Sequence, residues 1–109
     1  MQAFELAQLI FQQESSNTPY LEFLRVPSLS MGLYVLPAGA TDPQSPHMED
    51  EVYYVISGKA RIKIGNEDRN VEAGSIMYVP KNMEHRFHSI DEELRVLVFF
   101  APAEYENRP

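Results

Sequence analysis

The chain has 109 residues, of which 44% are hydrophobic and 23% are charged, and its net charge is −7 at pH 7. This length provides one core of ordinary size, and the acidic balance disfavours nucleic acid and anionic membrane surfaces as partners. The absence of cysteine excludes disulfides, zinc–thiolate sites, iron–sulfur clusters and thiol nucleophiles.

The first expected element is a short helix at about residues 3–14. Residues 3–13 contain no Gly or Pro, and their apolar side chains can form one apolar face of a helix. A cluster of turn formers, Ser15 to Pro19, ends the pattern. Short apolar runs separated by Gly, Pro and Asn then follow, and they predict strands at 20–25, 30–37, 51–57, 59–64, 69–72, 75–79, 84–89 and 94–100. Many short strands with one helix indicate an all-β sandwich or barrel.

Two of the expected strands are apolar on both faces. In 94–100, Leu94, Val96, Val98 and Phe100 form one face, and Leu97 with Phe99 make the other face apolar too. Residues 52–56 are likewise apolar on both faces. In so small a chain we expect the outer face of these strands to be covered by the N-terminal helix or by a second subunit. A homodimer is therefore expected.

Nothing in the sequence indicates a membrane or secreted protein. The longest apolar run, Val96 to Ala101, is far shorter than the ~20 residues that a membrane-spanning helix needs. No Lys or Arg precedes Arg25, so the charged opening of a secretory signal is missing. We expect a cytoplasmic protein with a small-molecule ligand or substrate.

The sequence has three histidines in two segments: His47 lies in an acidic segment, and His85 and His88 lie in a segment that follows a turn. His47 precedes Glu49, Asp50 and Glu51 at the start of an apolar strand, whereas the other two follow a turn at 80–82. One imidazole from each segment and one carboxylate would form a 2-His-1-carboxylate site, which leaves coordination positions open.

The two segments resemble the two motifs of the cupin family, specifically of its small single-domain members. Both motifs fit in every spacing, with three substitutions: Ser45 for the first His, Asn82 for a Gly and Ser89 for an Asn. The first reads from Gly39 through Ser45-Pro46-His47 and Glu51 to Gly58, and the second from Gly74 through Pro80-Lys81-Asn82 and His85 to Ser89. The resemblance implies a cupin jelly-roll barrel (double-stranded β-helix) with a short N-terminal helix, in a single domain over 1–109 with its core at about 20–101.

The resemblance also implies one divalent metal ion inside the barrel. His47, Glu51 and His85 match three of the four residues that bind the metal in the family. Ser45 stands at the fourth place, where its neutral hydroxyl is expected to hydrogen-bond a metal-bound water or a substrate, or to close the loop. The sequence leaves open whether the metal is Fe, Mn, Ni, Co or Zn.

Strand parity places further residues around this site. Tyr53 shares the face of Glu51 and is expected to donate into a pocket, and Phe87 shares the face of His85 and should line that pocket. Glu49 shares the face of His47 in an extended chain, so it is a candidate fourth ligand or proton carrier, although a solvated turn is the favoured interpretation. His88 falls on the opposite face and is expected at the surface or an interface.

Two functions fit this chemistry. The leading hypothesis is a metal-dependent enzyme, dioxygenase-like or isomerase-like, that acts on a small metabolite. The alternative is a module that binds or senses a small ligand without catalysis, and a purely structural barrel is a third possibility. The fold alone cannot decide among them, because one fold can support many activities.

Overall fold

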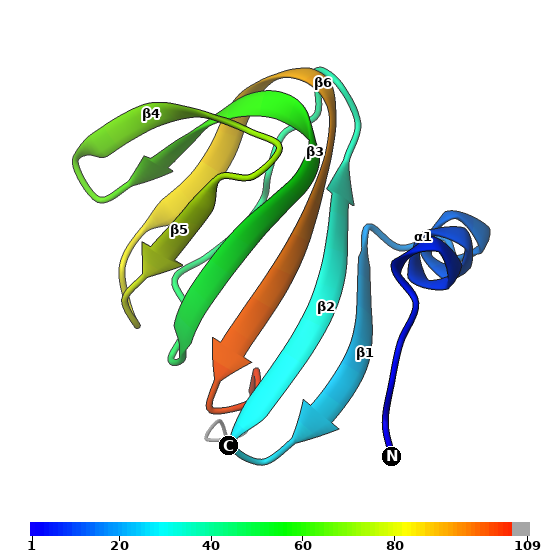
Figure 1. The fold of residues 1–109 in the computed structure, drawn as a ribbon. Coiled ribbons are helices and arrows are strands. Elements are labelled where there is room, and N and C mark those ends of the chain that lie inside the picture. The colour runs from blue at the N-terminus through cyan, green and yellow to red at the C-terminus, as the bar shows by residue number, and fades with distance from the viewer. Residues whose placement is uncertain (106–109) are drawn as a thin grey trace.

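The computed structural model describes residues 1–105, in which one α-helix precedes six antiparallel strands of a single sheet (Figure 1). The predicted all-β class is thereby confirmed. No helix within residues 1–105 is both long and apolar enough to cross a membrane. The elements are α1 (Leu6–Ser15), β1 (Tyr20–Val26), β2 (Leu29–Leu36), β3 (Asp50–Ile64), β4 (Glu67–Glu72), β5 (Ile76–Val79) and β6 (His85–Ala101).

The long strands β3 and β6 form the middle of the molecule. They pair along most of their length, from Asp50 opposite Ala101 to Ile64 opposite His85. The first half of β3 also pairs with β5 and the second half with β4, while β2 pairs with the last part of β6. Figure 1 shows β1, β2 and α1 on one side of this central pair and β4 and β5 on the other.

The continuity of β3 and β6 corrects two predicted chain breaks. The sequence predicts separate strands on either side of Gly58 and again around residues 91–93, but each pair is one strand in the structure. At Gly58 the chain has φ +99° and the pairing with β6 shifts register on both sides. A Cβ at this position would collide with the carbonyl group of Glu93. Gly58 therefore marks a bulge within a strand rather than the end of one.

The main core is built from alternate residues of the strands. On β6, Leu94, Val96, Val98 and Phe100 are buried, as the predicted alternation requires. They pack in one apolar cluster with Tyr53 and other side chains of β2, β3, β4 and β5. This cluster supplies the rigid wall beneath the candidate site.

A second apolar cluster lies under α1. Leu9 of the helix packs with Leu33 and Val35 of β2, and the partly buried Ile56 and Leu97 complete the cluster. The helix begins at Leu6, later than the predicted residue 3, and its apolar side covers part of the outer sheet face. The expectation that the helix covers the outer sheet face is therefore confirmed for the part of that face that contacts α1.

The segment after β6 packs against the sheet. The polar, Pro-bounded composition of 102–109 predicts a tail that is loose or wraps the surface. In its described part Ala103 and Glu104 are both buried, so that part is not loose. The Ala103 amide donates to the carbonyl of Pro27 at 3.2 Å, and the Glu104 amide donates to Ser30 Oγ at 2.9 Å. Residues 102–105 are thus docked against the β1–β2 end of the sheet, and 106–109 lie outside the described residues.

Candidate metal centre

The fold brings together three side chains that are far apart in the sequence. His47 lies in the loop before β3, Glu51 is at the start of β3, and His85 begins β6. One ligand atom from each of the three lies within 4.8 Å of the other two. The two imidazole ring centroids are 5.5 Å apart. This group contains two imidazoles and one carboxylate, the donor set that the sequence predicts.

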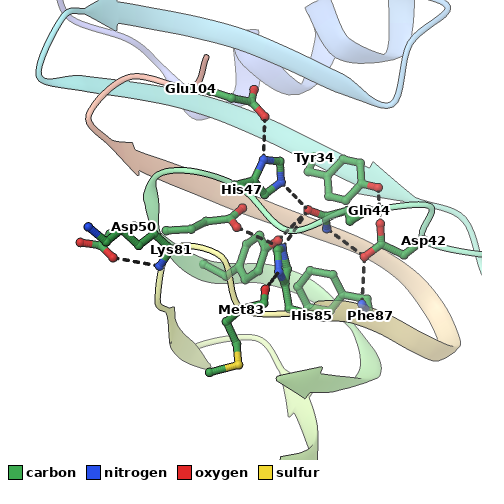
Figure 2. Close-up of polar contacts among 12 residues, drawn as sticks. Tyr34, Asp42, Gln44, His47, Asp50, Lys81, Met83, His85, Phe87 and Glu104 are labelled. Carbon is green, nitrogen blue, oxygen red and sulfur yellow. Dashed lines mark hydrogen bonds and ion pairs between the residues drawn. The ribbon is translucent and has the colours of Figure 1, made fainter. Parts of the chain in front are cut away.

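Hydrogen bonds tie the loops that carry the two histidines to each other. The Asn82 amide donates to the carbonyl of His47 at 2.6 Å. The Lys81 amide donates to Asp50 Oδ1 at 3.1 Å (Figure 2). Asn82 has φ +63°, the left-handed conformation that the motif position requires and that Asn tolerates well. These contacts fix where β6 starts, and therefore where His85 lies relative to His47.

Both imidazoles point their Nε2 atoms toward the same place. His85 Nδ1 lies 2.9 Å from the carbonyl of Met83, which can only accept, so this nitrogen carries the proton. His85 Nε2 then faces inward, 3.1 Å from Glu51 Oε1. His47 Nδ1 lies 3.4 Å from Glu104 Oε2, which leaves its Nε2 on the inner side (Figure 2). An acceptor thus lies behind each ring: the Met83 carbonyl forms a hydrogen bond with His85, and Glu104 contacts His47 at ion-pair distance.

Gln44 is a site residue that the sequence analysis misses. Its Oε1 lies 3.3 Å from His47 Nε2 and 3.2 Å from His85 Nε2, and it accepts a hydrogen bond from the Tyr53 hydroxyl at 3.0 Å. Its amide nitrogen donates to Asp42 Oδ2 at 2.9 Å. Because a carboxylate accepts hydrogen bonds, the nitrogen must face Asp42 and the oxygen must face the imidazoles.

Asp42 is the buried anchor of this loop. It accepts hydrogen bonds from the Tyr34 hydroxyl at 2.6 Å, from the Gln44 amide and, at 2.9 Å, from the backbone amide of Phe87. These donors offset the cost of burying the carboxylate. The contact with Phe87 joins the loop directly to β6. No periodic pattern in residues 37–49 signals this role, since the segment is a loop without strand alternation.

The centre holds more hydrogen-bond acceptors than protons. With Nδ1 protonated in both neutral rings, the two Nε2 lone pairs, Glu51 Oε1 and Gln44 Oε1 all face a common space. Among the described residues, no well-aligned hydrogen bond reaches Glu51 Oε1, which is fully buried. Burial lowers the pKa of His85, but the neighbouring Glu51 and the Met83 carbonyl raise it more, so the net shift is upward. The site therefore favours a positive charge, either a proton or a metal ion.

The remaining predicted site residues occupy different surroundings. Tyr53 is buried with its hydroxyl in the site, and burial followed by the charge of Glu51 raises its pKa, so the phenol stays protonated as a donor. Phe87 is buried behind it, with ring centroids 4.9 Å apart. Ser45 is exposed at the rim. His88 lies away from the centre and contacts Asp68 at 2.9 Å.

Glu49 contradicts the favoured solvated-turn interpretation. Its side chain is 1% exposed, and neither carboxylate oxygen accepts a hydrogen bond from the described residues. It does not belong to the His47–Glu51–His85 group. Residues 47–49 precede β3, so strand alternation does not govern the direction of their side chains.

A cavity of about 400 Å³ opens onto the centre. It is large enough for a small metabolite. Both polar and aromatic side chains form its wall, including those of Tyr20, Tyr34, Gln44, His47, Glu51, Tyr53, Phe100, Glu104 and Tyr105.

Comparison with known proteins places these observations in a family. The family described as Cupin domain matches residues 32–100. The chain is 50% identical over 104 residues to SCO3923 of Streptomyces coelicolor, which is described as uncharacterized, and the match covers 95% of this chain and 99% of that protein.

Solved structures share the fold. An RmlC-like cupin family protein with a double-stranded β-helix fold from Methanocaldococcus jannaschii matches with a TM-score of 0.67 at 22% identity, covering 81% of this chain and 84% of that one. The DMSP lyase DddQ from Ruegeria pomeroyi matches with a TM-score of 0.68 at 19% identity, covering 81% of this chain and 52% of that one. This chain thus spans about half of the lyase. At these identities the likeness concerns the fold, and it confirms the predicted double-stranded β-helix.

Proposed function

This chain belongs to the cupin domain family, and we propose that it is a small metal-binding cupin whose centre acts on a small, oxygen-bearing metabolite. One divalent metal ion would be held by His47, Glu51 and His85. We propose a metal-dependent enzyme of the dioxygenase or isomerase kind as its function.

One observation carries the proposal: four atoms that can each donate an electron pair to a cation converge on one space. They are the two imidazole Nε2 atoms, Glu51 Oε1 and Gln44 Oε1, with contacts of 3.1 to 3.3 Å. Imidazole nitrogen and carboxylate oxygen suit Fe, Mn, Co, Ni or Zn, and an amide oxygen is compatible with the harder of these ions. A cation at this point would satisfy all four atoms at once, so the residues fit the group.

The protein's own side chains would prepare the site for chemistry. When bound, a divalent metal supplies Lewis acidity toward a carbonyl or enolate oxygen and, as Fe(II), a place for O₂. Asp42 fixes the Gln44 amide, and the Tyr53 phenol holds a proton at the edge of the centre. The cavity lined by Tyr20, Tyr34 and Phe100 would orient a small ligand and limit the access of water.

Elemental analysis of the purified protein tests the metal site. We expect about one first-row divalent ion per chain in the parent protein and a strong loss of metal in His47→Ala and His85→Ala. His88→Ala is the matched control, because it removes an imidazole outside the centre. A parent protein that stays metal-free after incubation with each of the five ions, or a His88→Ala variant that alone loses metal, would overturn the assignment.

A second candidate function is a non-catalytic module that binds or senses a small ligand. It is favoured by the fact that the Tyr34 and Tyr53 hydroxyls are already engaged by Asp42 and Gln44. Oxygen consumption and product formation by the metal-loaded protein, measured with a panel of hydroxy acids, keto acids and enols, separate the two functions. Ligand-induced thermal stabilisation without turnover would favour the binding module.

We also propose that the protein is a homodimer through the outer sheet face that α1 leaves open. Ile76 and Tyr78 of β5 are 69% and 57% exposed. Tyr78 lies opposite Val52, and Val52 lies opposite Phe99, so apolar side chains cross three neighbouring strands. Such a surface is typical of an interface.

A further inference from the structure

Glu104 reaches the candidate metal centre from the segment that follows β6. Its Oε2 lies 3.4 Å from His47 Nδ1, which is an ion-pair contact rather than a well-aligned hydrogen bond, and both side chains are largely buried. Figure 2 shows Glu104 behind the His47 ring, on the side away from Gln44. No cupin motif in the sequence includes this position, and the family match ends at residue 100.

The contact is fixed by the packing of the segment around Glu104. The Glu104 amide donates to the fully buried hydroxyl of Ser30 at 2.9 Å, and the neighbouring Ala103 is completely buried. The amide of Ala103 donates to the carbonyl of Pro27. Two backbone hydrogen bonds and the burial of Ala103 therefore fix the segment that carries the Glu104 carboxylate. A tail without these contacts would not hold it there.

His47 needs such a support more than His85 does. His85 starts a strand and its Nδ1 is held by the Met83 carbonyl at 2.9 Å. His47 lies in a loop, where strand pairing does not orient its ring, and the edge of Phe100 contacts one side at a centroid distance of 5.0 Å. An acceptor behind Nδ1 selects the ring orientation and the tautomer that direct Nε2 inward.

Metal-bound histidines usually donate their second ring N–H to a carboxylate or a carbonyl, and removing this partner typically lowers metal affinity by about 10- to 100-fold. We propose that Glu104 is a positioning residue: it holds His47 Nδ1–H so that Nε2 faces the metal, which makes the C-terminal segment part of the metal centre. This inference rests on the proposed function, since it concerns the same ion.

Zinc affinity, measured on the full chain by competition with a chromogenic chelator, tests the proposal. Glu104→Leu fills the buried space but removes the acceptor, and we expect its zinc affinity to fall by about 10- to 100-fold. Glu104→Gln keeps the shape and an acceptor oxygen, so it should recover part of that loss. Glu67→Gln, which removes an exposed carboxylate on β4, should bind zinc as the parent does.

The outcomes separate this inference from the proposed function. A parent protein that binds no zinc or other divalent ion overturns both. A parent that binds zinc, with equal affinity in a folded Glu104→Leu variant, overturns the role of Glu104 alone. Thermal unfolding of the metal-free variants shows whether they fold. If Glu104→Leu does not fold, Glu104→Gln is used in its place. A zinc affinity of Glu104→Gln equal to that of the parent then overturns the proposal.

Discussion

The side-chain oxygen of Gln44 lies 3.2 Å from Nε2 of His85, although the two residues are 41 positions apart. Asp42 fixes the orientation of this amide by accepting from its nitrogen at 2.9 Å. The centre is thus completed by a residue adjacent to the position at which the family motif places a histidine. The neutral amide oxygen adds an acceptor without adding a charge.

Replacing Gln44 by Glu should separate the stability of the metal-free protein from its response to metal. A carboxylate at this position would lose the hydrogen bond that the amide nitrogen donates to Asp42 and would face the Asp42 and Glu51 carboxylates. We therefore expect the metal-free variant to lose about 1–3 kcal/mol of unfolding free energy. Added zinc or manganese should stabilise it more than it stabilises the parent, because the variant offers a second anionic oxygen to the cation. Chemical unfolding with and without metal measures both effects.

The control for this variant is Gln12→Glu, which makes the same change at an exposed position of α1. Its unfolding free energy should change little, and its response to metal should equal that of the parent. A Gln44→Glu variant that is as stable as the parent without metal would mean that the amide does not face Asp42.

Two tyrosines that line the same cavity should respond differently to loss of the hydroxyl. Tyr34 donates to the buried Asp42 at 2.6 Å, so Tyr34→Phe leaves a buried carboxylate short of one donor. We expect it to cost about 1.5–3 kcal/mol in urea unfolding. The buried Tyr20 hydroxyl has no hydrogen-bond partner among residues 1–105, so Tyr20→Phe should be neutral or stabilising. Equal losses in both variants would contradict this reading of the cavity wall.

The pKa of His85 predicts how the metal-free protein responds to pH. Its pKa in the folded state is raised, so the proton on His85 favours folding. This contribution is fully present below the unfolded value of about 6.5 and is lost as the pH rises through the folded pKa. The parent should therefore be more stable than His85→Gln by an amount that shrinks as the pH rises from roughly 6 to roughly 8, a range that begins near the unfolded pKa of about 6.5.

Metal should reverse this dependence. A divalent ion and a proton compete for the same Nε2 atoms, so apparent metal affinity should increase with pH over the same range. Chelator competition at several pH values measures it. A pH-independent metal affinity would mean that the imidazoles of His47 and His85 are not ligands.

The sequence predicts the strands of the core and the three residues of the centre better than it predicts the loops. Alternation identifies β6 because Leu94, Val96, Val98 and Phe100 have one side to bury. The resemblance to the two cupin motifs identifies His47, Glu51 and His85, of which Glu51 and His85 lie on β3 and β6 and His47 lies in the loop before β3. Alternation works in β6 because position along a regular strand determines the direction of the side chain.

Loop residues escape this reasoning. Motif spacing favours Ser45, yet Gln44 enters the site because its amide pairs with Asp42, a contact that no spacing rule contains. Glu49 is buried for a similar reason of local geometry, and Glu104 is brought in by the docking of its segment on Ser30. Gly58 and residues 91–93 have turn-like composition, but pairing between β3 and β6 keeps both strands continuous.

The proposed homodimer predicts that a charge on the open sheet face will dissociate it. Ile76 is 69% exposed, so Ile76→Lys should leave the fold of the single chain intact while burying an unpaired charge in the interface. We expect the parent to sediment as a dimer at micromolar concentration and this variant as a monomer. Phe11→Lys, on the exposed side of α1, is the control and should stay dimeric. A monomeric parent would remove the proposal.

Two glycines with similar backbone angles should tolerate alanine very differently. Gly58 has φ +99° and Gly74 has φ +94°, so a side chain at either position carries the conformational cost of a left-handed backbone, roughly 1–2 kcal/mol. At Gly74 an added Cβ meets nothing within 4 Å, whereas at Gly58 it collides with the backbone of Glu93 and Leu94. Backbone cannot rotate away, so Gly58→Ala must also open the pairing of β3 with β6. We expect Gly74→Ala to lose only the conformational cost in chemical unfolding and Gly58→Ala to lose substantially more. Equal losses would show that the bulge at Gly58 can adjust, and that the continuity of β3 does not depend on the close approach of the two strands there.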